Sequence, residues 1–267
     1  MATTQKQKEK KDQFIALCAD SLEAARWLLP FARRLSEDFH KGIILFTCCA
    51  DGDQWVGEVE CPHVVLKGDW ASAVEAMPVA FNVVLALVPC DPKASRNAMS
   101  NPKQLLKNFR QSKIAYMAVP TGLTTFSTAH VALTLDHQRE SKEKVLWASY
   151  MARFCHSDIQ VLHLPYTDPD FRNRLNNNIR YFEKIFNSLS IEYHLQALES
   201  GSQYAHPDLK ALARGGCDLF VSLVSDSRDR DFLDALLPPP PLRLLRSAAD
   251  TPILFVNQRD DLYIMCD

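Results

Sequence analysis

The sequence predicts an α/β protein made of two tandem domains, each with an open and mostly parallel sheet. Short continuous apolar runs alternate with amphipathic stretches along the chain, as expected for strands buried on both faces and for the helices between them. The order of these elements starts again after a turn-like segment at residues 121–125. Because strands that alternate with helices connect through right-handed crossovers, each half is expected to form a parallel sheet with helices on both faces.

The first half begins with an apolar run at residues 14–19, which predicts a buried strand. Asp20 and Ser21 then offer a helix N-cap, and residues 22–39 place their apolar side chains on roughly one helical face. The remaining predicted elements of this half are strands at 43–47, 59–66, 82–88 and 114–119 and helices at 70–77 and 102–111.

The second half restarts with an apolar strand at residues 131–135, which is followed by Asp136 and a predicted helix at 141–154. A long amphipathic helix is predicted at 168–189, and a pair of glycines ends the helix predicted at 207–214. The other predicted elements are strands at 159–164, 191–198, 218–224 and 253–256 and a helix somewhere between residues 232 and 249.

Two sequence echoes indicate that the halves arose by internal duplication. Residues 27–33 are similar in sequence to residues 147–153, and residues 82–88 are similar to residues 218–224. The two pairs occur in the same order of elements. The apolar centre of the last ten residues could add a strand to a sheet edge, within the chain or across a dimer. We therefore expect a flexible tail at 1–12, an N-terminal domain at 13–121, a C-terminal domain at 126–257 and a C-terminal tail at 258–267.

The composition indicates a folded protein with no attraction to nucleic acid. The formal net charge is −2, from 30 Lys and Arg against 32 Asp and Glu, so phosphate backbones are not favoured partners. No apolar run is long enough for a signal peptide or a membrane span, and we expect no membrane partner. Eight cysteines without a metal-binding spacing are typical of small buried side chains in a reducing compartment. The sequence therefore predicts a cytoplasmic protein without a metal site.

Several segments of the second half together resemble the universal stress protein (UspA-like) family. They are the strand with its acid at 131–136, the strand at 159–164, the helix, glycine pair and strand at 208–221, and the closing strand at 251–256. The first half resembles a degenerate copy, in which the segment 50–57 replaces the long helix between the second and third strands. The resemblance implies two tandem Rossmann-like domains of the adenine nucleotide alpha hydrolase-like type, which meet through their last strands as an intramolecular pseudo-dimer.

The glycine motif with which many members of that family bind ATP is missing from this chain. The motif reads Gly-x2-Gly-x9-Gly-Ser/Thr and follows the fourth strand, where backbone amides approach the phosphates. The matching segments here, 222–241 and 86–96, contain no glycine, and the first of them carries four aspartates and four consecutive prolines. Carboxylates repel phosphate and proline has no amide hydrogen, so we expect no ATP site and no cofactor.

The resemblance also points to a few candidate site residues. Asp20 and Asp136 stand where the family places an acid near bound nucleotide, although helix capping explains both and is the favoured interpretation. If a nucleotide does bind, Asp136, Ser225 and Ser227 are the residues expected to contact it. His156 and His163 have no partner ligands in the sequence pattern and are interpreted as ordinary histidines, and no catalytic motif is present.

We therefore predict a stress-response or regulatory binding protein without enzymatic turnover. Its partner would be another protein or a second copy of the chain. The alternative is a sensor of adenine nucleotides, ATP or AMP, with a non-standard phosphate site, and a weak nucleotide hydrolase is the third choice. The four prolines at 238–241 are expected to be a stiff connector that opens a helix rather than a ligand for a partner groove.

Overall fold

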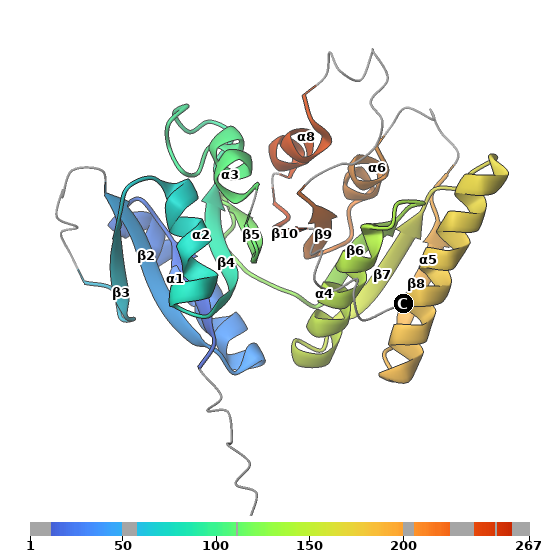
Figure 1. The fold of residues 1–267 in the computed structure, drawn as a ribbon, viewed down its shortest axis with the longest axis horizontal. Coiled ribbons are helices and arrows are strands. Elements are labelled where there is room, and N and C mark those ends of the chain that lie inside the picture. Colours follow the sequence, from blue (N-terminus) through green and yellow to red (C-terminus); the bar gives the residue numbers. More distant parts are fainter. Residues whose placement is uncertain are drawn as a thin grey trace, which may run out of the picture.

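One continuous sheet runs through the whole protein. The computed structural model describes residues 12–49, 58–110, 112–199, 206–224, 238–248 and 250–257. Ten strands in these residues follow the order β3-β2-β1-β4-β5-β10-β9-β6-β7-β8 (Figure 1). The strands are β1 (Phe14–Cys18), β2 (Gly42–Cys49), β3 (His63–Lys67), β4 (Val83–Cys90), β5 (Ala115–Pro120), β6 (His130–Leu135), β7 (Asp158–His163), β8 (Tyr193–Ala197), β9 (Leu219–Leu223) and β10 (Ile253–Val256).

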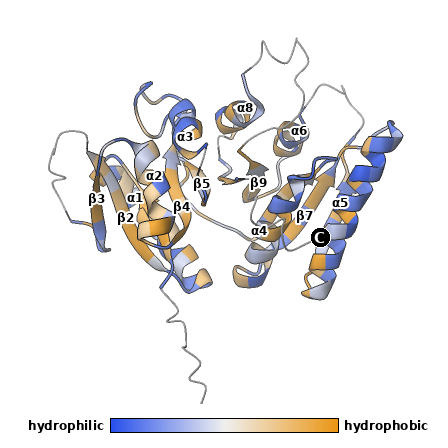
Figure 2. Ribbon diagram, in the orientation of Figure 1, coloured by the Kyte–Doolittle hydropathy of each residue, from blue (hydrophilic) through white to orange (hydrophobic). Residues whose placement is uncertain are grey.

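Helices cover the sheet on both faces, as the continuous apolar strands require. One core cluster contains buried residues of three helices, and a second cluster on the opposite face contains buried residues of four others. Hydrophobic residues accordingly dominate the strands, whereas each helix is divided between apolar and polar sides (Figure 2). The first face carries α1 (Leu22–Phe39), α4 (Ser141–Phe154) and α5 (Pro169–Ser188), and the second carries α2 (Trp70–Ala80), α3 (Pro102–Phe109), α6 (Pro207–Arg214) and α8 (Pro240–Ser247).

The two halves of the chain have the same strand order and meet through their last strands. Every neighbouring pair of strands is parallel except β5 and β10, which are antiparallel. At this junction the rings of Tyr116 and Phe255 stack with their centroids 5.2 Å apart. The halves thus form an intramolecular pseudo-dimer, and the predicted meeting of the last strands is confirmed.

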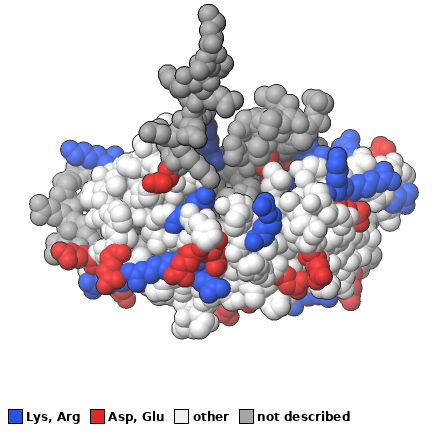
Figure 3. Space-filling view, turned by 90° about the horizontal axis from the view of Figure 1, so that it is seen from below, with Lys and Arg blue, Asp and Glu red and all other residues white. Residues whose placement is uncertain are grey.

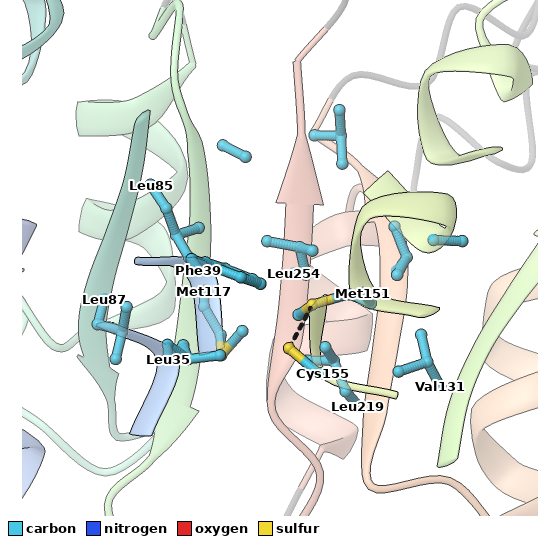
Figure 4. Packing of buried hydrophobic residues seen from close by; sticks show 14 of the residues in the cluster. Leu35, Phe39, Leu85, Leu87, Met117, Val131, Met151, Cys155, Leu219 and Leu254 are labelled. Carbon is cyan, nitrogen blue, oxygen red and sulfur yellow. Dashed lines mark hydrogen bonds between the residues drawn. The ribbon is translucent and has the colours of Figure 1, made fainter. Parts of the chain in front are cut away.

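The core continues across this junction without a break. On one side lie Leu85, Leu87 and Met117, and on the other Leu219 and Leu254, all with no solvent exposure (Figure 4). Helices α1 and α4 join the halves a second time, because the ring of Phe39 packs 4.8 Å from that of Tyr150.

The connection between the halves is also fixed by a specific hydrogen bond. The indole nitrogen of Trp27, on α1, donates to the carbonyl oxygen of Leu123 at 3.1 Å. Phe126, three residues further on, packs with its ring 5.3 Å from that of Phe31. The segment that the sequence places between two domains is therefore packed against the N-terminal half.

Several element boundaries differ from those predicted. The strand expected at 59–66 is β3, which starts only at His63, because Pro62 accepts the hydrogen bond from Leu45 and pairing with β2 begins there. The strand expected at 191–198 is β8 and is shorter, since Ile191 still donates to Phe186 at the end of α5. The helix expected between 232 and 249 is α8, and it starts at Pro240 as a proline-initiated helix does. Both terminal tails, 1–11 and 258–267, and the segment 50–57 lie outside the described residues.

A buried hydroxyl at the junction gives a testable prediction. Tyr116 has no solvent exposure, and its hydroxyl oxygen has no hydrogen-bond partner among the described protein groups. A buried polar group without a partner destabilises the folded state, so Tyr116→Phe is expected to raise the free energy of unfolding by about 1 kcal/mol. Urea denaturation of both proteins measures this. A loss of stability in the variant would mean that the hydroxyl is hydrogen-bonded, for example through a buried water.

Candidate functional site

The carboxyl ends of β6 and β9 are where a ligand would be expected in this sheet. In the C-terminal half the strand order is β8-β7-β6-β9-β10, so the chain turns in opposite directions from these two neighbouring strands. Open parallel sheets bind ligands in the crevice that this reversal creates. The same position in the N-terminal half lies between β1 and β4.

Four polar side chains fill the crevice at β6 and β9. The ammonium group of Lys144, from α4, lies 3.8 Å from the carboxylate of Asp208, on the first turn of α6. Lys144 also donates to the hydroxyl oxygen of Thr134 at 3.0 Å. Thr134 in turn donates to one carboxylate oxygen of Asp208, and Ser222 donates to the other at 2.5 Å. The result is a closed network that links β6, β9, α4 and α6.

The charges in this network are almost entirely buried. Lys144 is 1% exposed and Asp208 is 4% exposed. Burial alone would raise the pKa of Asp208, but the nearby charges of Lys144 and His206 and the hydrogen bonds from Ser222 and Thr134 together hold it below its ordinary value. Asp208 also lies at the N-terminus of a helix, where a negative charge is favoured. Asp208 is therefore ionised at neutral pH.

Asp136 lies beside this network but holds the protein's own loop. One of its carboxylate oxygens accepts from the amide of Gln138 at 2.9 Å and from the hydroxyl of Ser141 at 2.5 Å. The side-chain amide of Asn178, from α5, donates to the carbonyl oxygens of Asp136 and Gln138. Asp136 is only 3% exposed, and the hydrogen bonds at this one oxygen hold the loop that follows β6.

The predicted helix-capping roles of Asp136 and Asp20 are wrong. The N-cap position of α4 is Glu140, four residues after Asp136, and no side chain caps that helix. The N-cap of α1 is Ser21, whose hydroxyl accepts from the amide of Ala24 at 3.2 Å, while Asp20 is exposed beside it. Asp136 instead accepts from the side-chain hydroxyl of Ser141, the first residue of α4, and among the described residues no hydrogen bond joins the side chain of Asp20 to α1.

The structure does not bring the remaining candidate site residues into the buried network. Ser225 and Ser227 lie outside the described residues. His163, at the end of β7, is half-buried, and burial lowers its pKa below the ordinary value. His156 is exposed, in a left-handed backbone conformation with φ of 54°. Neither histidine takes part in the hydrogen bonds of the buried network.

The cavity that remains in the crevice is very small. Its walls include Lys144, Asp208 and Ser222 on one side and Pro241 and Leu244 of α8 on the other. The volume open to the centre of a water-sized sphere is about 10 Å³, which is close to what a single water molecule requires. The space enclosed by these described residues therefore holds about one water molecule.

The equivalent position in the N-terminal half is apolar. Cys18 ends β1 and Ala19 follows it, while Val88 and Cys90 belong to β4. All four residues are at most 3% exposed. Burial raises the pKa of Cys18 far above its ordinary value and that of Cys90 to about 12, so neither thiol ionises at neutral pH. Among the described residues of this half no buried charged side chain corresponds to the Lys144–Asp208 pair, and the acids that follow these two strands, Asp20 and Asp91, are exposed and half-exposed, respectively.

On the face seen from below, Lys and Arg are intermixed with Asp and Glu, and no broad area of one sign is visible (Figure 3). Specific binding of nucleic acid by electrostatics needs clustered positive charge. Among the helices of the described residues, none combines the length and the apolar composition needed to cross a membrane.

The fold and the crevice define a class of protein: two Rossmann-like halves fused into one sheet, with the ligand position of one half occupied by a buried ion pair. Comparison with solved structures places this architecture in the tandem universal stress protein fold. A universal stress protein from Archaeoglobus fulgidus DSM 4304 superposes with a TM-score of 0.64 over 92% of this chain and 98% of its own, at 12% sequence identity.

Two further structures match over nearly the full length. A candidate universal stress protein from Pseudomonas aeruginosa UCBPP-PA14 has a TM-score of 0.58 at 10% identity and covers 92% of both chains. The cytoplasmic domain of a prokaryotic cation chloride cotransporter also has a TM-score of 0.58 at 10% identity, covering 96% of this chain and 100% of that domain. No protein-family model and no curated protein sequence matches the chain. These identities establish the fold alone.

Proposed function

We propose that this protein is a non-catalytic binding protein of the universal stress type, which acts in a stress response or in regulation and does not bind ATP. The observation that carries the proposal is the buried Lys144–Asp208 pair in the crevice of the C-terminal half. Because the ammonium group of Lys144 already pairs with the carboxylate of Asp208, it is not available to bind a phosphate. The location in the cytoplasm and the existence of a protein partner, which could be a second copy of the chain, are predictions from the sequence.

Three features of the crevice support binding without turnover. Thr134 and Ser222 are at most 2% exposed, so their hydroxyl groups are not open to a substrate that arrives from solution. Asp136 lines the cavity, but one of its carboxylate oxygens already accepts hydrogen bonds from Gln138 and Ser141. The cavity accommodates about one water molecule. These features also argue against the nucleotide hydrolase considered from the sequence.

The competing function, a sensor of ATP or AMP, is tested by thermal unfolding with added nucleotide. A ligand that binds only the folded protein raises its melting temperature, by the equivalent of about 2.7 kcal/mol at a concentration one hundred times its Kd. We expect no shift with millimolar ATP or AMP and magnesium, relative to magnesium chloride and sodium triphosphate as controls. A saturable shift with either nucleotide, abolished by Asp136→Ala, would overturn the proposal in favour of the sensor.

A further inference from the structure

The outer edge of β3 (His63–Lys67) carries apolar side chains at the end of the sheet. β3 and β8 are the two end strands, and none of the other described strands pairs with the outer side of β3 (Figure 1). Val65 is 50% exposed, although valine is among the most often buried residues. Val64 and Leu66, which alternate with Val65 and pack against the second core cluster, are only partly buried. Because an edge strand presents a row of backbone N–H and C=O groups, β3 is suited to accept a further strand.

The charges at the two edges of the sheet differ. β3 ends at Lys67, which is exposed and makes no ion pair with another described residue. β8 contains no Lys, Arg, Asp or Glu and lies between the exposed acids Glu192 and Glu199. A lysine on an edge strand ordinarily opposes the addition of another strand. A segment that brings an acid to Lys67 removes this obstacle, whereas the same segment would meet like charges at β8.

The C-terminal tail has the composition that the edge of β3 requires. Residues 262–266 read Leu-Tyr-Ile-Met-Cys, and Asp260 and Asp261 precede them. Tyrosine and isoleucine favour strands, and this run contains neither glycine nor proline. The tail lies outside the described residues, and its sequence alone is compatible with pairing within the chain or between two chains.

The distance from Asn257 to the sheet edges decides between these alternatives. Asn257 follows β10 in the middle of the sheet, and its side-chain amide donates to the carbonyl oxygens of Phe109 and Ser112 at 3.1 and 2.5 Å. Five Cα–Cα steps join Asn257 to residue 262, and they span at most about 18 Å. With strands about 4.8 Å apart, the position outside β3 lies about 29 Å from β10, and the position outside β8 lies about 24 Å from it. Residues 262–266 therefore cannot extend either edge of their own sheet.

We propose that residues 262–266 pair as an antiparallel strand with the outer edge of β3 in a second copy of the chain. With Ile264 opposite Val65, Asp261 comes beside Lys67, and the side chains on the other face of the added strand extend the second core cluster. Backbone hydrogen bonds supply affinity, and the alternating side chains supply specificity. This self-association does not depend on whether the crevice binds a nucleotide, so it holds or fails separately from the proposed function.

Sedimentation velocity of the full chain over a range of protein concentrations, under reducing conditions, tests the proposal. The wild type is expected to associate increasingly as its concentration rises. Val65→Glu places a charge at the centre of the contact and is expected to weaken association on the order of tenfold or more. The matched control is Leu195→Glu, which places the same charge on a β8 side chain that is 36% exposed and should associate like the wild type. Both replaced side chains are exposed, so the fold is expected to persist, which circular dichroism checks.

A charge exchange tests the part that the tail plays in this contact. Lys67→Glu replaces an attraction between the two copies with a repulsion and is expected to weaken association severalfold. Adding Asp261→Lys restores opposite charges, so the double variant should recover most of the lost affinity. A wild type that stays monomeric at every concentration would overturn the proposal. The same conclusion follows if Val65→Glu leaves association unchanged, or if the double variant associates no better than Lys67→Glu alone.

Discussion

Lys144→Met is expected to lower the free energy of unfolding by about 3–5 kcal/mol, because it leaves the buried carboxylate of Asp208 without its partner charge. Urea denaturation at neutral pH measures the loss. The control is Lys184→Met, which removes an exposed lysine from α5 and should change stability by less than about 0.5 kcal/mol. An effect of Lys144→Met as small as that of the control would contradict a buried and charged pair.

Two further measurements separate the charge from the packing. The double variant Lys144→Met with Asp208→Asn has no unpaired charge, so it is expected to recover more than half of the loss. The pKa of Asp208 is below its ordinary value in the folded protein, so its stabilising effect is present above the unfolded-state pKa of about 4 and disappears as the pH falls through the folded-state pKa. The difference between wild type and Lys144→Met should therefore shrink on acidification.

Phe39→Ala is expected to cost about 3–5 kcal/mol and to weaken both halves of the protein together. Phe39 is 2% exposed, and its ring contacts those of Tyr150 and Phe154 across the junction. Because the sheet and the core are continuous, opening of the C-terminal half should become easier as well. Native-state hydrogen exchange at the amides of β6 and β9 reports this directly.

The matched control for this variant is Val79→Ala on α2, which truncates a side chain that is 81% exposed. Its effect should stay below about 0.5 kcal/mol. If Phe39→Ala accelerated exchange in β1 and β2 only, the halves would be independent folding units and the coupling across the junction would be refuted.

The general arrangement could be predicted because it depends on short-range patterns. Continuous apolar runs such as 82–88 and 131–135 are buried on both faces and form β4 and β6, and the repeated element order indicates the pseudo-dimer. The start of β3 could not be predicted, because an edge strand is half-exposed and its apolar pattern is weak. The length of β3 depends on which residues of β2 are available for strand pairing, and this is decided only when the sheet assembles.

The residues that fill the crevice were missed for a related reason. Lys144 lies in the first turn of an amphipathic helix, where a lysine is ordinarily solvent-exposed, and Asp208 has the sequence context of a first-turn helix acid. Only the packing of α4 and α6 over neighbouring strands brings the two together. The missing glycines, together with the aspartates and prolines of 222–241, are the sequence signals against a phosphate site, and they do not indicate which side chains fill this crevice.

The antiparallel seam between β5 and β10 changes how substitutions act on this protein. In a symmetric homodimer every mutation occurs twice, once in each subunit, so both copies of a crevice must change together. Here the two copies lie in one chain and are held together covalently, so each can be altered alone. The two halves differ accordingly at this position, since one has a buried Lys–Asp pair and the other has buried cysteines. The covalent link thus allows one half to be specialised while the other serves mainly as its structural support.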